Sequence, residues 1–211
     1  LSDALPFLGL EHLRSSLNVV GERGLDEDQL HTTGHLITHE YGHRWCGKYH
    51  RPAGMVSPDH HHPTDMRLLW VYEGLDQYLG VVLTARAGLF ATKEYSSMEG
   101  ALRDGWVGVG KTLVGLMRQK GRRSISLEDT AASTYLRRRW GKFWTALNRP
   151  QDYYFEGALL WYEIDAILRE DSDSKITLDD FVRRFLGRYD AAKDMMGFEE
   201  SDVITILNDL H

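Results

Sequence analysis

The feature that most constrains this chain is the pentapeptide His39-Glu40-Tyr41-Gly42-His43, an HExxH pattern. It lies within residues 29–48, where apolar side chains recur near helical spacing. Four residues apart on a helix, two imidazoles share one face and can hold one metal ion, and Glu40 leaves the helix beside them. Zinc binds imidazole well and lowers the pKa of bound water, so a carboxylate can complete the deprotonation. The pattern therefore predicts a catalytic zinc site with Glu40 as the base.

A catalytic zinc ion needs three protein ligands and one open position. Glu73 lies in the otherwise apolar helical stretch Leu68-Leu69-Trp70-Val71-Tyr72-Glu73-Gly74. A charged residue on such a face is rarely buried without a partner, and a metal is one such partner. We therefore expect Glu73 to be the third ligand, the alternative being a glutamate that faces water beside Asp76 and Gln77. The histidine run His60-His61-His62 is more simply a polar loop than a native metal site.

The pattern of the whole chain predicts a mainly helical domain. The 211 residues contain 5 prolines and no low-complexity linker, which favours one unit over residues 1–211. Capped starts are expected at Ser126, followed by Asp129, and at Thr177, followed by Asp180. Strand signals are few, and the best lies around Asn18 to Val20. The expected helices cover residues 29–48, 64–88, 93–119, 126–147, 154–170, 177–188 and 199–210.

Composition excludes some classes of partner and leaves the compartment open. The net charge of -6 disfavours binding to nucleic acid or to an anionic membrane through bulk electrostatics. No apolar run approaches the roughly 18 to 20 residues that a membrane helix needs. Cys46 is the only cysteine, so no disulfide can form within the chain, and either the cytoplasm or the periplasm fits. The sequence opens at Leu1 as if inside a domain, so we expect a fragment of a longer protein.

Several segments together resemble one family of metallopeptidases. Residues 39–52 read HEYGHRWCGKYHRP, which resembles the HExxHxWNxKxxRP helix of the glycyl aminopeptidase-like proteins. Residues 68–74 are similar to the LLWxxEG segment that holds the third zinc ligand of that family. Residues 9–12 match the second half of its GGxEH segment, and residues 153–157 resemble its YYxKG segment. The departures are Leu8 for glycine, Cys46 for asparagine and Glu156 for lysine.

The resemblance implies a thermolysin-like gluzincin catalytic domain, with at most a little β structure near the N-terminus, that flanking domains accompany in full-length relatives. It implies one zinc ion per chain on His39, His43 and Glu73, and a peptide substrate attacked by zinc-bound water. By analogy, Glu11 would bind the α-amino group of the substrate and His12 would line the pocket. Tyr154, with Tyr153 as its rival, would donate a hydrogen bond to the oxyanion. The expected function is therefore that of an aminopeptidase acting on N-terminal residues, which the family association suggests are small.

Other functions compete with this interpretation. A non-catalytic member or an endopeptidase of the same fold would carry the same motifs. Gly105–Thr112 satisfies the GxxxxGK[ST] pattern of a nucleotide-binding loop. That loop must follow a buried strand and open a helix, and the residues before it are not an apolar strand, so nucleotide hydrolysis is the weakest alternative.

Overall fold

The computed structural model describes residues 1–5, 7–27, 29–89, 98–137, 149, 151–187 and 195–211. It is mainly helical, which confirms the predicted fold class. The helices are α1 (Leu30–Gly42), α2 (Leu69–Arg86), α3 (Met98–Arg118), α4 (Leu127–Ala132), α5 (Thr134–Arg137), α7 (Asp152–Asp171), α8 (Leu178–Leu186) and α9 (Glu200–Asn208), with short 3-10 turns η1 (Ala53–Met55) and η2 (Lys120–Arg123). The strands are β1 (Leu8–Glu11), β2 (Ser16–Val19), β3 (His50–Pro52) and β4 (Met196–Phe198).

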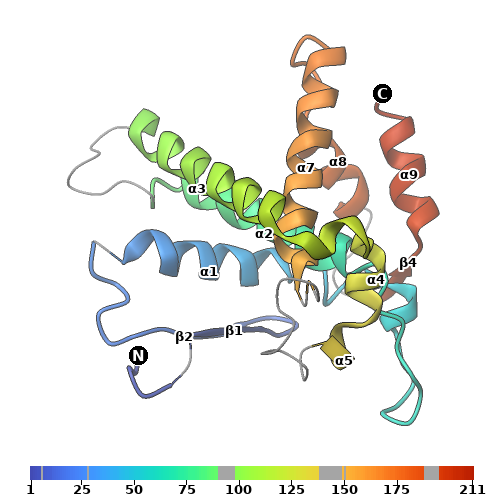
Figure 1. Ribbon diagram of the computed structural model, residues 1–211, viewed down its shortest axis with the longest axis horizontal. Coiled ribbons are helices and arrows are strands. Elements are labelled where there is room, and N and C mark those ends of the chain that lie inside the picture. The colour runs from blue at the N-terminus through green and yellow to red at the C-terminus, as the bar shows by residue number, and fades with distance from the viewer. Residues whose placement is uncertain (6, 28, 90–97, 138–148, 150, 188–194) are drawn as a thin grey trace.

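Helix α2 is the central element, because it packs along both α1 and α7. In Figure 1 the β1–β2 hairpin lies beside α1, α7 stands steeply to the α1–α2 pair, and α9 carries the C-terminus. The main core forms where α2, α7, α8 and α9 meet, and its fully buried side chains include Val71, Leu75, Trp161, Phe181 and Val203. This core fixes α2 from the side opposite α1, so α2 can present the other face to the functional site.

The strands form two small pairs. In the antiparallel β1–β2 pair, Leu8 lies opposite Val19 and Glu11 opposite Ser16. Strands β3 and β4 pair in parallel, although they are far apart in the sequence. The predicted strand at Asn18–Val20 overlaps β2, but β1, β3 and β4 were not predicted. Strands of three or four residues are too short to show a clear alternation of polar and apolar side chains.

Several helix boundaries differ from those predicted. Helix α1 ends at Gly42, and the following turn reaches Gly47, whose φ of 150° is incompatible with a continuing helix. Helix α2 begins at Leu69, later than the predicted residue 64. The helix predicted over residues 126–147 is instead α4 and α5, separated at Ser133, and its remainder lies outside the described residues, as do 93–97 and 188. The capping boxes predicted at Ser126 and Thr177 are confirmed.

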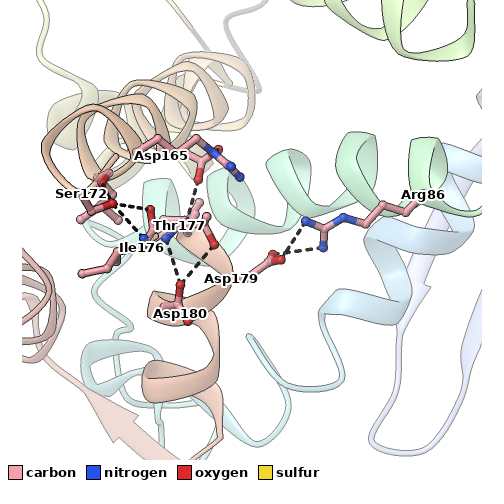
Figure 2. Close-up of polar contacts among 10 residues, drawn as sticks. Arg86, Asp165, Ser172, Ile176, Thr177, Asp179 and Asp180 are labelled. Carbon is pink, nitrogen blue, oxygen red and sulfur yellow. Dashed lines mark hydrogen bonds and ion pairs between the residues drawn. The ribbon is translucent and has the colours of Figure 1, made fainter. Parts of the chain in front are cut away.

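A polar network joins the end of α7, the start of α8 and the end of α2 (Figure 2). The Asp165 carboxylate accepts a hydrogen bond of 2.7 Å from the first backbone N–H of α8. The Thr177 N–H donates to Asp180 at 2.9 Å, and Arg86 donates two bonds to Asp179, at 2.8 and 3.1 Å. Exposed ion pairs stabilise little, so this Arg86 contact links α2 to α8 but adds little to stability.

The nucleotide-binding alternative is wrong in the structure. Residues Gly105–Thr112 lie inside α3 and do not form a loop between a strand and a helix. The Thr112 hydroxyl donates to the Gly108 carbonyl at 3.0 Å, which is ordinary for a threonine within a helix. Because the backbone N–H groups of a helix interior are engaged in the helix, they cannot cradle phosphate groups.

Two glycines allow α2 and α7 to approach closely. A Cβ atom on Gly74 would lie 2.8 Å from the Gly157 Cα atom, and one on Gly157 would lie 3.0 Å from the Gly74 Cα atom. The Trp161 indole then donates across the contact to the Trp70 carbonyl at 3.2 Å. The two sequence-predicted site residues on these helices, Glu73 and Tyr154, therefore depend on a contact that tolerates no side chain.

We expect Gly157→Ala to lower the free energy of unfolding by about 1–3 kcal/mol, because the added methyl group must push α7 away from α2. Gly110→Ala is the matched control, since a Cβ atom there has no neighbour within 4 Å. This control should be neutral or gain up to about 1 kcal/mol from helix propensity. Urea unfolding of both variants measures the difference, and equal effects would contradict the proposed importance of the α2–α7 contact.

Candidate metal centre

His39 and His43 of α1 and Glu73 of α2 bring three possible ligand atoms together. The Nε2 atoms of the two histidines are 3.0 Å apart, and Glu73 Oε2 lies 3.5 Å from that of His39 and 3.1 Å from that of His43. An ion bound tetrahedrally at about 2.0–2.1 Å from each atom would require ligand separations of about 3.3 Å. The spacing therefore suits a small divalent ion such as zinc.

The charge states of the group also suit a metal. Burial acts to raise the pKa of Glu73, but the charge of His43 and contacts with both histidines outweigh it, and the pKa falls to about 2. Burial acts to lower the pKa of His43, but the carboxylates of Asp76 and Glu73 outweigh it and raise the pKa. Without a metal, a protonated His43 thus compensates the buried carboxylates. A divalent cation can take over that role.

Asp76 orients His43 from behind. Its Oδ2 atom lies 2.6 Å from His43 Nδ1 as an ion pair, and the same nitrogen lies 3.0 Å from the Cys46 carbonyl oxygen. Asp76 is fully buried. A Cβ atom on Gly42 would clash with the Asp76 carboxylate, so this glycine makes room for it. Holding Nδ1 in this way turns Nε2 towards Glu73, as metal-binding histidines require.

Glu40 is buried beside the two histidines and beneath β1. Any Cβ atom on Gly9 would clash with the Glu40 carboxylate, so the strand can pass this close only with glycine at that position. Burial raises the pKa of Glu40, although the charges of His43 and His39 oppose the shift. A raised pKa improves a carboxylate as a proton acceptor near neutral pH.

Glu11, at the end of β1, is held by two donors. The Tyr72 hydroxyl donates to Glu11 Oε1 at 2.6 Å, and Lys48 Nζ lies 3.2 Å from the same oxygen. Burial acts to raise the pKa of Glu11, but the Tyr72 hydrogen bond and the charges of His43 and Lys48 lower it overall. The Tyr72 ring also lies 4.8 Å from that of His43, so Tyr72 connects Glu11 to the metal group. Sequence reasoning gave no role to Tyr72 or Lys48.

The two tyrosines at the start of α7 differ in position. The Tyr153 hydroxyl is 2.9 Å from the Thr134 hydroxyl, and Tyr153 is buried in a small apolar cluster. The Tyr154 ring is half-buried and lies 6.2 Å from that of His39. Of the two, Tyr154 therefore lies beside the metal group while Tyr153 is engaged elsewhere.

The remaining histidine candidates lie apart from this group. His12 is exposed at the β1–β2 turn, and within the described residues no contact joins its side chain to Glu11 or to the metal group. His60 to His62 are exposed on the loop before α2, where His62 contacts Asp59 at 2.7 Å. In the described part of the chain, only His39, His43 and Glu73 form a group of three or more possible ligands.

Comparison with known proteins identifies the family of the chain. The family model for M61 glycyl aminopeptidases matches residues 32–160, which include all three candidate ligands. The chain belongs to the M61 glycyl aminopeptidase family. This confirms the resemblance inferred from the sequence motifs.

The fold of the chain is also similar to that of a solved structure. The crystal structure of an aminopeptidase N family protein from Idiomarina loihiensis matches with a TM-score of 0.68 and 22% sequence identity. The match covers 95% of this chain and 38% of that chain, and at this identity it shows the fold alone. No curated protein matches the sequence. None of the helices described here combines the length and apolar character needed to cross a bilayer.

We expect Glu73→Ala to abolish stoichiometric zinc binding, because two histidines alone leave the ion short of a ligand. Asp76→Asn should weaken zinc binding by about 10- to 100-fold, because a partner of His43 is lost while the three ligands remain. Asp179→Asn is the matched control, since its carboxylate pairs with Arg86 at the far end of α2. Elemental analysis and chelator competition measure both effects. Full zinc retention in Glu73→Ala would contradict the assignment.

Proposed function

We propose that this domain is the catalytic part of a zinc-dependent peptidase, most specifically an aminopeptidase. The observation that carries the proposal is the buried His39–His43–Glu73 group beside the buried carboxylate of Glu40. Membership of the M61 family supports it. When bound, zinc would activate a water molecule for attack and polarise the scissile carbonyl.

Glu40 moves the proton in the proposed reaction. Its carboxylate takes a proton from the attacking water and later delivers it to the nitrogen of the leaving amine. Its raised pKa supports the first step, because a higher pKa makes the carboxylate a better proton acceptor. Glu40 is buried, which limits the access of bulk water to its carboxylate.

Tyr154 stabilises the carbonyl oxygen as negative charge develops on it. An ordinary phenol keeps its proton at pH 7 and can donate a hydrogen bond to an oxyanion. The half-buried position of Tyr154 near His39 supports this role. Its neighbour Tyr153 is less suited, because its hydroxyl is engaged with Thr134.

Glu11 binds the α-ammonium group and so limits cleavage to the first peptide bond. An ammonium held by an ionised carboxylate forms a strong, directional contact that positions the N-terminal residue. The lowered pKa of Glu11 and its fixation by Tyr72 support the role. The N-terminal residues removed are small, by analogy with the family, and the exposed His12 contributes at most to the rim of the pocket.

Residues 1–211 form one catalytic domain in this proposal, and in the whole enzyme it works together with flanking domains. The chain spans only 38% of the length of the structurally similar aminopeptidase N family protein, which supports additional domains. An endopeptidase is the second candidate function, because Lys48 already pairs with Glu11 and could make an α-ammonium unnecessary there.

Glu40→Gln tests the base. The variant should bind zinc as wild type does yet lose about 10²- to 10⁴-fold in kcat, because an amide cannot accept the proton of the water. Glu163→Gln, an exposed change of the same type on α7, serves as the control. Peptidase assays with zinc-loaded protein give the comparison, and activity of Glu40→Gln within about threefold of wild type would refute the mechanism.

The role of Glu11 separates an aminopeptidase from an endopeptidase. Acetylating the substrate N-terminus should reduce kcat/KM by roughly ten- to a hundredfold, because a charge-assisted hydrogen bond is lost and Glu11 is left desolvated. Glu11→Ala should cost a similar factor with free peptides and much less with acetylated ones, so the two changes are non-additive. A double cycle of kcat/KM measures this coupling. Equal cleavage of free and acetylated peptides by wild type would indicate an endopeptidase.

A further inference from the structure

The carboxylate that is proposed to bind the α-ammonium already has a cation beside it. Lys48 Nζ and the Tyr72 hydroxyl both contact Glu11 Oε1, at 3.2 and 2.6 Å. The side chains of Lys48 and Glu11 are only 24% and 18% exposed, so the pair is partly shielded from solvent. With Oε1 held by two donors, Oε2 is the oxygen that a further cation can approach.

The turn after α1 builds Lys48 into this position. The Lys48 N–H donates to the carbonyl of His43 at 3.0 Å, so the lysine backbone is bonded directly to a candidate metal ligand. The preceding residue, Gly47, has a φ of 150°, and its carbonyl accepts a hydrogen bond of 2.8 Å from Arg51. Lys48 therefore starts from a fixed backbone and belongs to the site.

We propose that Lys48 determines specificity, acting as a charge filter beside Glu11 that disfavours substrates with a basic N-terminal side chain relative to neutral or acidic ones. This inference rests on the proposed function, because it takes Glu11 as the group that binds the α-ammonium. It assigns a substrate class, namely peptides whose first residue carries no positive side chain.

The filter follows from the charges that meet at Glu11. An α-ammonium on Oε2 and Lys48 on Oε1 place two cations on one carboxylate. The substrate side chain branches from the carbon that bears the ammonium, so a charge on it lies on the order of 10 Å from Lys48, which is close to the Debye length, and is only partly screened by salt. Lys48 repels a third cation and attracts an anion, whichever way the side chain points. For a partly exposed pair at such distances, the effect should be roughly three- to tenfold.

Lys48→Met tests the filter, because it removes the charge and keeps most of the length. In the full-length enzyme, kcat/KM is measured for the alanyl, glutamyl and lysyl anilides. Loss of the charge should raise the lysyl-to-alanyl ratio roughly three- to tenfold and lower the glutamyl-to-alanyl ratio. Both changes should shrink in high salt. Lys48→Arg should keep the wild-type ratios, as should Lys175→Met, which removes an exposed lysine at the α7–α8 turn.

The ratios of kcat/KM among the three anilides, compared within one variant, distinguish an effect of Lys48 on specificity from an effect on the position of Glu11. If Lys48 only holds Glu11 in place, Lys48→Met lowers kcat/KM equally for all three anilides, and the filter is refuted. Unchanged ratios that are accompanied by unchanged activity refute it as well.

Calorimetric titration of the α-amides of alanine, glutamate and lysine reports binding without turnover. Amides that bind with the expected charge preference, while no anilide is cleaved, would support the filter and refute the peptidase function. Cleavage with unchanged ratios would refute the filter and leave the function standing. If no amide binds and no anilide is cleaved, both the filter and the peptidase function are refuted.

Discussion

The close packing of α1 against α2 is the constraint on which the rest of the structure depends. The Thr38 hydroxyl of α1 lies 2.8 Å from both the Gly80 carbonyl and the Thr84 hydroxyl of α2. A Cβ atom on Gly80 would lie 3.3 Å from that of His39, and one on Gly42 would clash with Asp76. Small residues on both helices thus set the separation at which a histidine pair and a glutamate share one point. A pair of helices spaced by larger side chains would hold these ligands too far apart for one ion.

This packing also concentrates negative charge. Glu40 and Asp76 are buried, Glu73 is nearly so, and Glu11 lies at the rim. Carboxylates that lose water near one another are costly unless cations compensate them. His43 supplies one positive charge when protonated, and a bound divalent ion supplies two. Binding of a metal ion would therefore stabilise the folded state by an amount set by its affinity. Under the proposed function, the same electrostatics that prepares the site for an ion would make the metal-free domain the less stable form.

The sequence revealed residues marked by local spacing or by unusual surroundings, and it missed contacts that only the fold creates. The i, i+4 spacing of His39 and His43 and the apolar surroundings of Glu73 predicted three side chains that the structure brings together. Capping boxes likewise predicted helix starts, because their partners lie three residues apart. By contrast, Tyr72 bonds to Glu11 across 61 residues, and only the fold brings them into contact. The close passage of β1 over Glu40 was also beyond reach, because the four-residue strand gives no clear pattern.

Helix α2 links the two halves of the proposed site. Within little more than one turn it carries Glu73, a candidate ligand; Asp76, which orients His43; and Tyr72, which holds Glu11. Under the proposed function, the span between the metal and the α-ammonium sets how many residues are removed in each cleavage. That span is fixed by neighbouring positions on one rigid helix and by the Tyr72 ring against His43. A shift of α2 would move the ligand and the anchor of Glu11 together. The register of cleavage is thereby less sensitive to motion than if two separate elements held these groups.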